Sequence, residues 1–95
     1  MPASISEAEL SVVKSFLKEK KLKHLRCRKR AAAIIVESGP DDDALGHVRL
    51  RKLSAQKWAA DEFHHTGRWA QLPVEAPLNE ALRAIAADFS WILEV

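Results

Sequence analysis

Apolar residues near the N-terminus recur every three or four positions, which is the period of an α-helix. The residues of this apolar stripe are Leu10, Val13, Phe16 and Leu17. Ser6 and Glu9 precede the stripe with the spacing of a capping box, in which each side chain accepts a hydrogen bond from the other residue's backbone amide. The pattern predicts a helix from about Glu7 to about Lys20.

The middle of the chain changes to a period of two, which is typical of strands that bury one face. Leu25 and Cys27 alternate with arginines, and the apolar run that follows is typical of a buried strand, with a bend or turn near Arg30 and Ala31. The predicted strands are residues 24–30, 31–37, 47–53, 58–63 and 68–72.

The last two of these strands form a hairpin that carries two of the three tryptophans, Trp58 and Trp69. Two registers fit the turn between them. In the tighter turn Trp69 opposes His64 and shares a face with Trp58. In the wider turn Gly67 adopts a left-handed conformation and Trp69 opposes Phe63 instead.

A second helix is predicted from about Leu78 to Phe89, because apolar residues again recur at helical spacing. Pro73 and Pro77 are expected to bracket a short linker before it, and Pro77 suits the first turn of the helix. The segment Trp91–Leu93 is expected to fold back onto the body.

The order of these elements predicts an α+β fold in one domain, residues 1–95. Four or five antiparallel strands form a meander, because consecutive strands are joined by short connections. The N-terminal and C-terminal helices pack on one face of the sheet. The other face is then expected to carry Arg49, Arg51 and one or more tryptophans.

Composition narrows the class of protein. No apolar run approaches the roughly 18 residues of a membrane span, and the N-terminus does not have the pattern of a signal peptide. Cys27 is the single cysteine, so no intramolecular disulfide can form. The expected compartment is the cytoplasm, with no membrane partner.

The net charge of +2 conceals an uneven distribution. Residues 18–30 contain eight basic residues and one acid, which gives +7, while the rest of the chain carries −5. Such a segment suits a polyanion such as nucleic acid, or an acidic protein. The candidate contacts are Lys20, Lys21, Lys23, Arg26, Arg28, Lys29, Arg30, Arg49 and Arg51, and Trp58 and Trp69 are candidates for stacking on bases.

Two other interpretations of the same residues stay open. The basic side chains can form a solvated face that pairs with the protein's own carboxylates, such as those of residues 41–43. Alternatively, an open sheet face can bury its apolar surface in a homodimer. The tryptophans can likewise serve as core or cross-strand packing.

An enzyme is a third interpretation, with a site built on Cys27, His64 or His65. Basic neighbours favour a Cys27 thiolate, but the alternation directs this side chain to the apolar face, where a cysteine acts as a small hydrophobe. No spacing matches a zinc site. No catalytic residue, metal ligand or cofactor is therefore assigned, and a non-enzymatic binding domain is the preferred interpretation.

The hairpin Trp58–Trp69, with its spacing between tryptophans, resembles a family of small uncharacterised bacterial proteins, the domain-of-unknown-function family numbered 3024. Residues 48–51 before the hairpin and 78–82 after it look similar too, so the resemblance covers about two thirds of the chain. The chain departs from the family by having Ala60, Asp61 and Leu72 where aromatics are usual, and by its C-terminal segment. The resemblance implies no activity and transfers no site residue.

Overall fold

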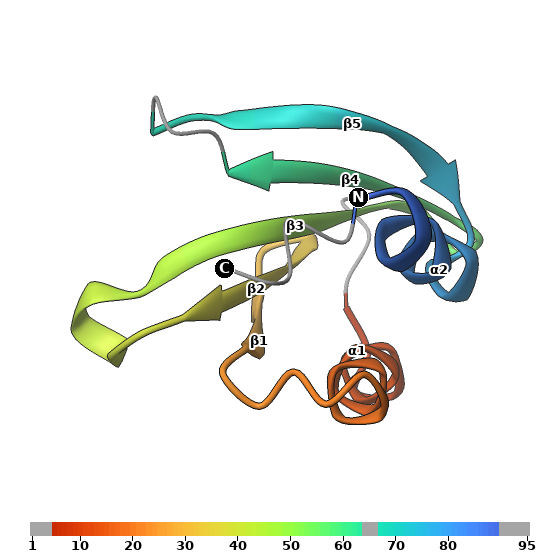
Figure 1. Ribbon diagram of the computed structural model, residues 1–95. Coiled ribbons are helices and arrows are strands. Elements are labelled where there is room, and N and C mark those ends of the chain that lie inside the picture. Colours follow the sequence, from red (N-terminus) through yellow and green to blue (C-terminus); the bar gives the residue numbers. More distant parts are fainter. Residues whose placement is uncertain (1–4, 64–66, 90–95) are drawn as a thin grey trace.

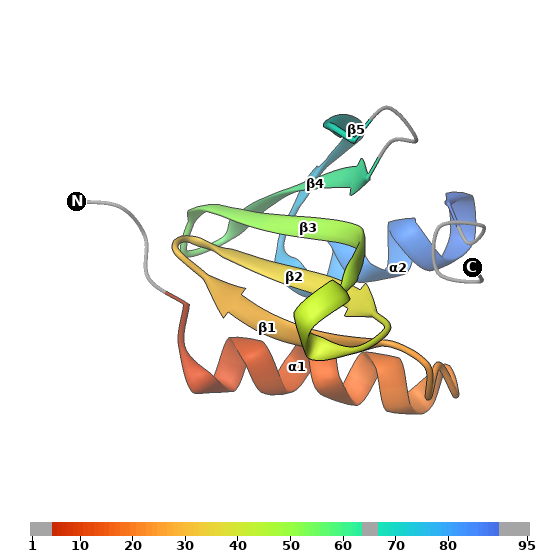
Figure 2. The same ribbon diagram turned by 90° about the vertical axis from the view of Figure 1, so that its left-hand side faces the viewer.

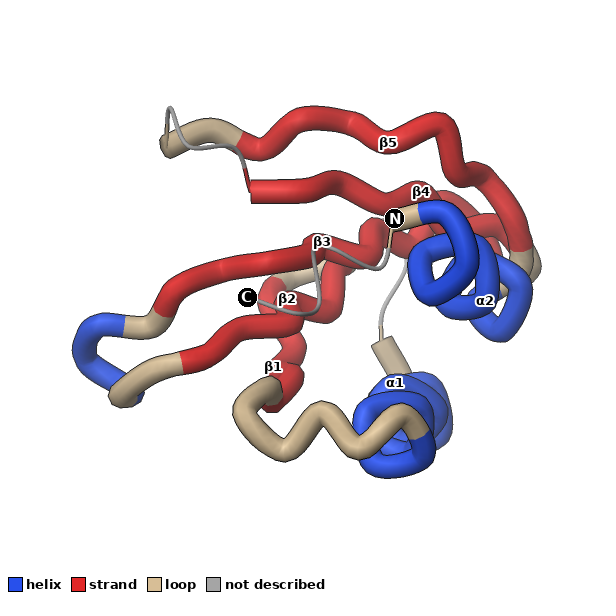
Figure 3. The backbone as a smooth tube through the Cα atoms, viewed as in Figure 1, coloured by secondary structure: helices blue, strands red, loops and turns tan. Residues whose placement is uncertain are grey.

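The computed structural model describes residues 5–63 and 67–89, apart from the side chain of Asp41. The predictions for His64, His65 and Trp91–Leu93 lie outside these residues. The described residues form two α-helices, five strands and a short 3-10 helix between the second and third strands. Figure 3 colours the helices blue and the strands red. The elements are α1 (Glu7–Glu19), β1 (Arg26–Arg30), β2 (Ala33–Ser38), η1 (Asp41–Asp43), β3 (Leu45–Ser54), β4 (Lys57–Phe63), β5 (Trp69–Ala76) and α2 (Leu78–Asp88).

The five strands form one antiparallel sheet in chain order, so the predicted α+β meander is confirmed (Figure 1). Helix α1 packs along β1, α2 packs against β4 and β5, and the two helices contact each other (Figure 2). Both helices contribute to a single apolar core with the same face of the sheet, as expected from their apolar stripes.

Helix α1 begins at the predicted capping box. The Ser6 hydroxyl accepts a hydrogen bond from the Glu9 amide at 3.1 Å, and the Glu9 carboxylate accepts one from the Ser6 amide at 2.9 Å. Lys52 of β3 also donates to the Glu9 carboxylate at 2.9 Å, and both side chains are largely buried, with exposures of 14% and 20%. Glu9 therefore joins the start of the helix to the sheet.

This link makes the stability of the protein sensitive to acid. Burial raises the pKa of Glu9, but hydrogen bonds from Lys52 and Ser6 outweigh it, so the pKa lies below its ordinary value of 4.5. A carboxyl whose pKa is lowered by folding stabilises the fold above its unfolded pKa and loses that contribution as pH falls. We expect Glu9→Gln to reduce the free energy of unfolding by about 1 kcal/mol at pH 7 and by little at pH 2–3.

Urea denaturation at both pH values measures this difference. Glu80→Gln, an exposed substitution in the first turn of α2, serves as the control and should show no comparable pH dependence. An equal loss for Glu9→Gln at both pH values would show that the side chain contributes through packing and not through its charge.

The core lies between the two helices and the sheet. Its largest fully buried side chains come from both layers and are Trp58, Ile34, Leu50, Ile85, Val13 and Val48. On β4, Trp58 and Ala60 point toward the helices, because alternate residues of a strand share a face. Arg49 of β3 and Asp61 of β4 therefore point to the face opposite the helices.

The predicted bend near Arg30 and Ala31 is a hairpin turn. Ala31 and Ala32 connect β1 directly to β2, and Arg30 pairs with Ala33 across the turn. Ala31 has a φ of 52°, a left-handed conformation that is uncommon for alanine. The tight turn places the basic strand β1 at the edge of the sheet, next to the apolar strand β2.

The prediction that Pro73 begins a linker is wrong, because Pro73 lies inside β5. Around Pro73, Ala59 pairs with Glu75 and Asp61 pairs with Gln71. Residues 72–74 of β5 therefore lie opposite a single residue of β4, Ala60. A bulge on an edge strand tolerates proline, since no ladder hydrogen bond requires its missing N–H. The strand therefore continues to Ala76.

The wider of the two predicted hairpin registers is the one observed. Trp69 pairs with Phe63, and Gly67 has a φ of 85°. Because Phe63 and Trp58 lie an odd number of residues apart on β4, the two tryptophans lie on opposite faces of the sheet. Trp58 faces the helices and Trp69 faces away from them.

Candidate anion-binding face

The face of the sheet opposite the helices carries arginines on two strands. Residues paired across neighbouring strands share a face, so the register defines two rows across this surface. One row contains Arg28, Ile35, Arg49, Asp61 and Gln71, and the next contains Arg30, Ala33, Arg51, Ala59 and Glu75. We call this surface the arginine face.

A buried carboxylate organises the two arginines of β3. Asp61 is only 2% exposed, and its Oδ2 accepts hydrogen bonds from Arg49 Nε at 3.0 Å and Arg51 Nε at 2.7 Å. Arg51 Nη2 also donates to Oδ1 at 3.2 Å. A carboxylate hidden from water needs such partners, because burying an unpaired charge is very unfavourable. Two guanidinium groups share one carboxylate, so the cluster keeps a positive charge.

A second buried carboxylate plays the same part for β1. Glu37 is 3% exposed, accepts a hydrogen bond from Arg28 Nε, and lies 3.7 Å from Arg26 Nη2. Arg26 Nη1 also donates to the backbone oxygen of Gly39. Arg26 and Arg28 of β1, like Arg49 and Arg51 of β3, are thus held by a carboxylate that lies beneath them.

A shallow hollow of about 740 Å³ lies over the arginine face. Its apolar floor includes Ile35 and Ala33, which are nearly fully buried. Four arginines line it, namely Arg28, Arg30, Arg49 and Arg51. Against the two buried carboxylates, Glu37 and Asp61, these four leave an excess of positive charge, and the third carboxylate of the face, Glu75, is paired with Lys57.

An aromatic pair closes one end of the hollow. The rings of Phe63 and Trp69 meet edge to face with centroids 5.2 Å apart, and the Arg49 guanidinium lies 5.0 Å from the centroid of the Trp69 ring. Trp69 fits closely over Gly46, where an added Cβ would lie 3.1 Å from the ring. Phe63 is 37% exposed and Leu45 beside them 51%, so this end presents apolar surface to solvent.

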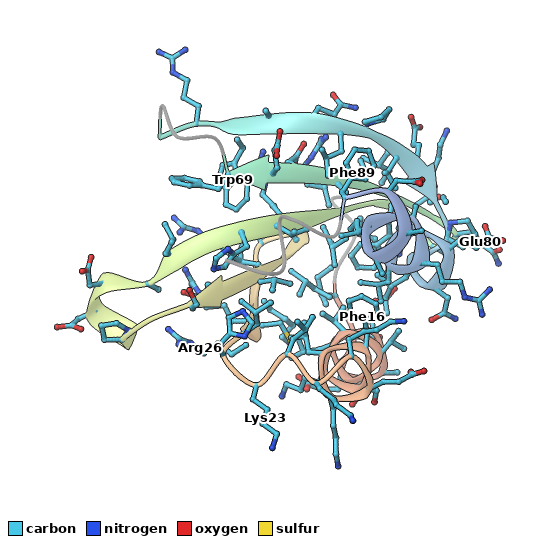
Figure 4. The ribbon with its side chains drawn as sticks, in the orientation of Figure 1. Phe16, Lys23, Arg26, Trp69, Glu80 and Phe89 are labelled. Carbon is cyan, nitrogen blue, oxygen red and sulfur yellow. The ribbon has the colours of Figure 1, made fainter. Side chains whose placement is uncertain are left out.

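The structure divides the basic segment that the sequence presents as one site. Lys20, Lys21 and Lys23 are exposed in the connection after α1, and Figure 4 shows Lys23 projecting there. Lys29 pairs with Glu7 of α1 at 3.0 Å, and this contact lowers the pKa of Glu7. None of these lysines lines the hollow. Lys29 lies on the side of β1 that faces α1, because neighbouring residues of a strand point to opposite faces, and the other three lysines precede the strand.

The assignment of Trp58 as a stacking residue is wrong, because its side chain is 1% exposed within the core. Trp69 remains a candidate, since it lies at the hollow and away from Phe16 and Phe89 near the helices (Figure 4). Sequence reasoning missed Glu37, Asp61 and the floor. The sequence signal for Glu37 and Asp61 is weak, because each is a single carboxylate whose partners become evident only when neighbouring strands are aligned.

The structure adds little support for a catalytic or metal site. Burial raises the pKa of the Cys27 thiol, more than the charge of Lys14 lowers it, so the neutral thiol is favoured. His47 is buried and shares a 2.7 Å hydrogen bond with the Ser38 hydroxyl. Within residues 5–63 and 67–89, no three His, Cys, Asp or Glu side chains gather as a set of metal ligands.

No helix in that part of the chain is long and apolar enough to cross a membrane.

Comparisons with protein families, curated proteins and solved structures found no match to this chain. The resemblance to the family numbered 3024 therefore stays a prediction. The candidate site rests on the geometry of the arginine face alone.

Proposed function

We propose that this protein is a non-enzymatic binding domain whose arginine face contacts a polyanion, with nucleic acid as the preferred ligand. One observation carries the proposal. Four arginines surround a solvent-facing hollow above two buried carboxylates, so the face is ordered and still positively charged. Phosphate recognition requires this combination of charge and donors.

The buried carboxylates fix the arginines without using all their donors. A guanidinium group has five N–H groups. Arg49 gives one of them to Asp61, and Arg51 gives one from each of two nitrogens. The remaining N–H groups can bind phosphate oxygens. Because the side chains are already held, less rotamer entropy is lost on binding than for free arginines.

Charge also separates the alternatives. In a two-fold homodimer formed through this face, the arginines of one copy would meet those of the other, and the repulsion opposes association. An acidic protein could pair with the same arginines as a nucleic acid does. Binding experiments are therefore needed to distinguish these two partners. The cytoplasm remains the proposed compartment, because the lone Cys27 suits a reducing environment.

Salt dependence tests the proposal. We expect a fluorescent oligonucleotide to bind with an affinity that falls steeply between about 50 and 200 mM salt. Arg49→Gln with Arg51→Gln should weaken binding at least about tenfold and lower the slope of log K against log salt by about 1.4, since each phosphate contact on a single strand contributes about 0.7. Fluorescence anisotropy measures both quantities.

Lys20→Gln with Lys21→Gln is the matched control, because it removes the same two charges from outside the face. It should leave the slope nearly unchanged. Equal losses in the two double variants would mean that net charge alone drives binding. Weak binding that does not respond to salt would remove the polyanion proposal altogether.

A further inference from the structure

The arginines of the face stand in two columns with an apolar strip between them. Arg28 of β1 and Arg49 of β3 both pair with Ile35 of β2. Two residues along the strands, Arg30 and Arg51 both pair with Ala33. Because neighbouring strands lie about 4.8 Å apart, the two columns are separated by about 10 Å. The strip between them is the floor of the hollow.

The width and the floor of the hollow suit one nucleic-acid strand better than two. Phosphates are strongly hydrated and gain nothing from contact with Ile35 or Ala33, whereas sugars and base faces do. In a duplex the bases stack on each other, and their faces are hidden from a flat protein surface. A single strand exposes its bases to the floor and its phosphates to the arginines on either side.

The aromatic end of the hollow adds a second feature that favours unpaired bases. Trp69 and Phe63 lie beside Arg49, and both line the hollow, so a base can reach their surface next to a phosphate contact. Base–aromatic stacking is the usual source of affinity in proteins that bind single strands. An acidic peptide would use the arginines but has no need of the aromatic pair.

We propose that the arginine face binds single-stranded nucleic acid, with phosphates contacted by the arginines of β1 and β3 and a base stacked at the Phe63–Trp69 pair. The inference rests on the proposed polyanion function and narrows it to one ligand class. Trp69 supplies the part of the affinity that depends on bases, and Arg28, Arg30, Arg49 and Arg51 supply the part that depends on salt.

Five ligands test it by anisotropy or competition, each at about 50 and 200 mM salt. They are an oligothymidine of about 12 nucleotides, a duplex of the same length, an abasic strand of that length, heparin and polyglutamate. The single strand should bind at least about tenfold more tightly than the duplex or the abasic strand. Trp69→Leu should weaken binding of the single strand about tenfold and leave heparin unaffected, while Trp69→Phe should retain most of the affinity.

Retained heparin binding shows that Trp69→Leu is folded with its arginines in place. Leu53→Ala is the matched control, because Leu53 is 47% exposed and also lines the hollow but is not aromatic. Equal affinity for single strand and duplex, with no effect of Trp69→Leu, would overturn this inference and leave the polyanion function standing. A tighter complex with polyglutamate than with the oligonucleotide would replace nucleic acid by an acidic protein, and absence of salt-dependent binding to every ligand would remove both.

Discussion

Replacement of Trp58 by alanine is expected to lower the free energy of unfolding by about 4 kcal/mol. The side chain is 1% exposed and lies in the core between the sheet and the helices. Its removal loses the transfer free energy of a large ring and leaves a cavity that the surrounding side chains fill only in part. Since domains of this size have total stabilities of about 5–15 kcal/mol, the variant should be close to unfolding at room temperature.

Trp69→Ala provides the comparison on the other face of the same hairpin. Trp69 is only half buried, and its contacts include an edge-to-face pair with Phe63, the Arg49 guanidinium and the backbone at Gly46. We expect a loss of about 1 kcal/mol, because exposed aromatic and cation–π contacts are each weak. Urea denaturation followed by circular dichroism gives both values. Similar losses at the two positions would contradict the placement of the tryptophans on opposite faces.

These two residues illustrate how far the sequence could be interpreted without coordinates. Alternation along β4 shows that Trp58 and Asp61 face opposite sides, and the capping box at Ser6 and Glu9 marks the start of α1, because both patterns depend only on near neighbours in the chain. Placing Trp69 required the geometry of the turn. Sequence reasoning left two registers open, and a shift of one residue moves a side chain to the other face.

The arginine face required more than local pattern. Residues 26–30 were grouped with Lys20, Lys21 and Lys23 because they are close in sequence, yet a strand sends alternate residues to opposite faces. The pairing of Asp61 with both Arg49 and Arg51 depends on the alignment of β3 with β4, which no short motif encodes. Pro73 was misplaced for a related reason, since the bulge that tolerates it is a property of two strands together.

Replacement of Asp61 by asparagine is expected to have the second large effect on stability. It tests whether this carboxylate holds the arginines of β3 in place. The change keeps the volume of the side chain but removes the only carboxylate that contacts Arg49 and Arg51 among the described residues. Breaking a fully buried ion pair costs about 3–5 kcal/mol. Here the arginines are 32% and 35% exposed and regain some hydration, so we expect a loss of about 2 kcal/mol.

The effect of Asp61→Asn on the free energy of unfolding should change from destabilising to stabilising when the two arginines are absent. With Arg49→Gln and Arg51→Gln in place, Asp61 becomes a buried charge without compensation, and its replacement by asparagine should then stabilise the fold. Urea denaturation of the four variants gives this coupling as a thermodynamic cycle. Glu75→Gln is the control, because Glu75 forms an exposed pair with Lys57 and should cost less than about 0.5 kcal/mol. If Asp61→Asn destabilised both backgrounds equally, the carboxylate would act through shape alone, and the arginines would not depend on it for their position.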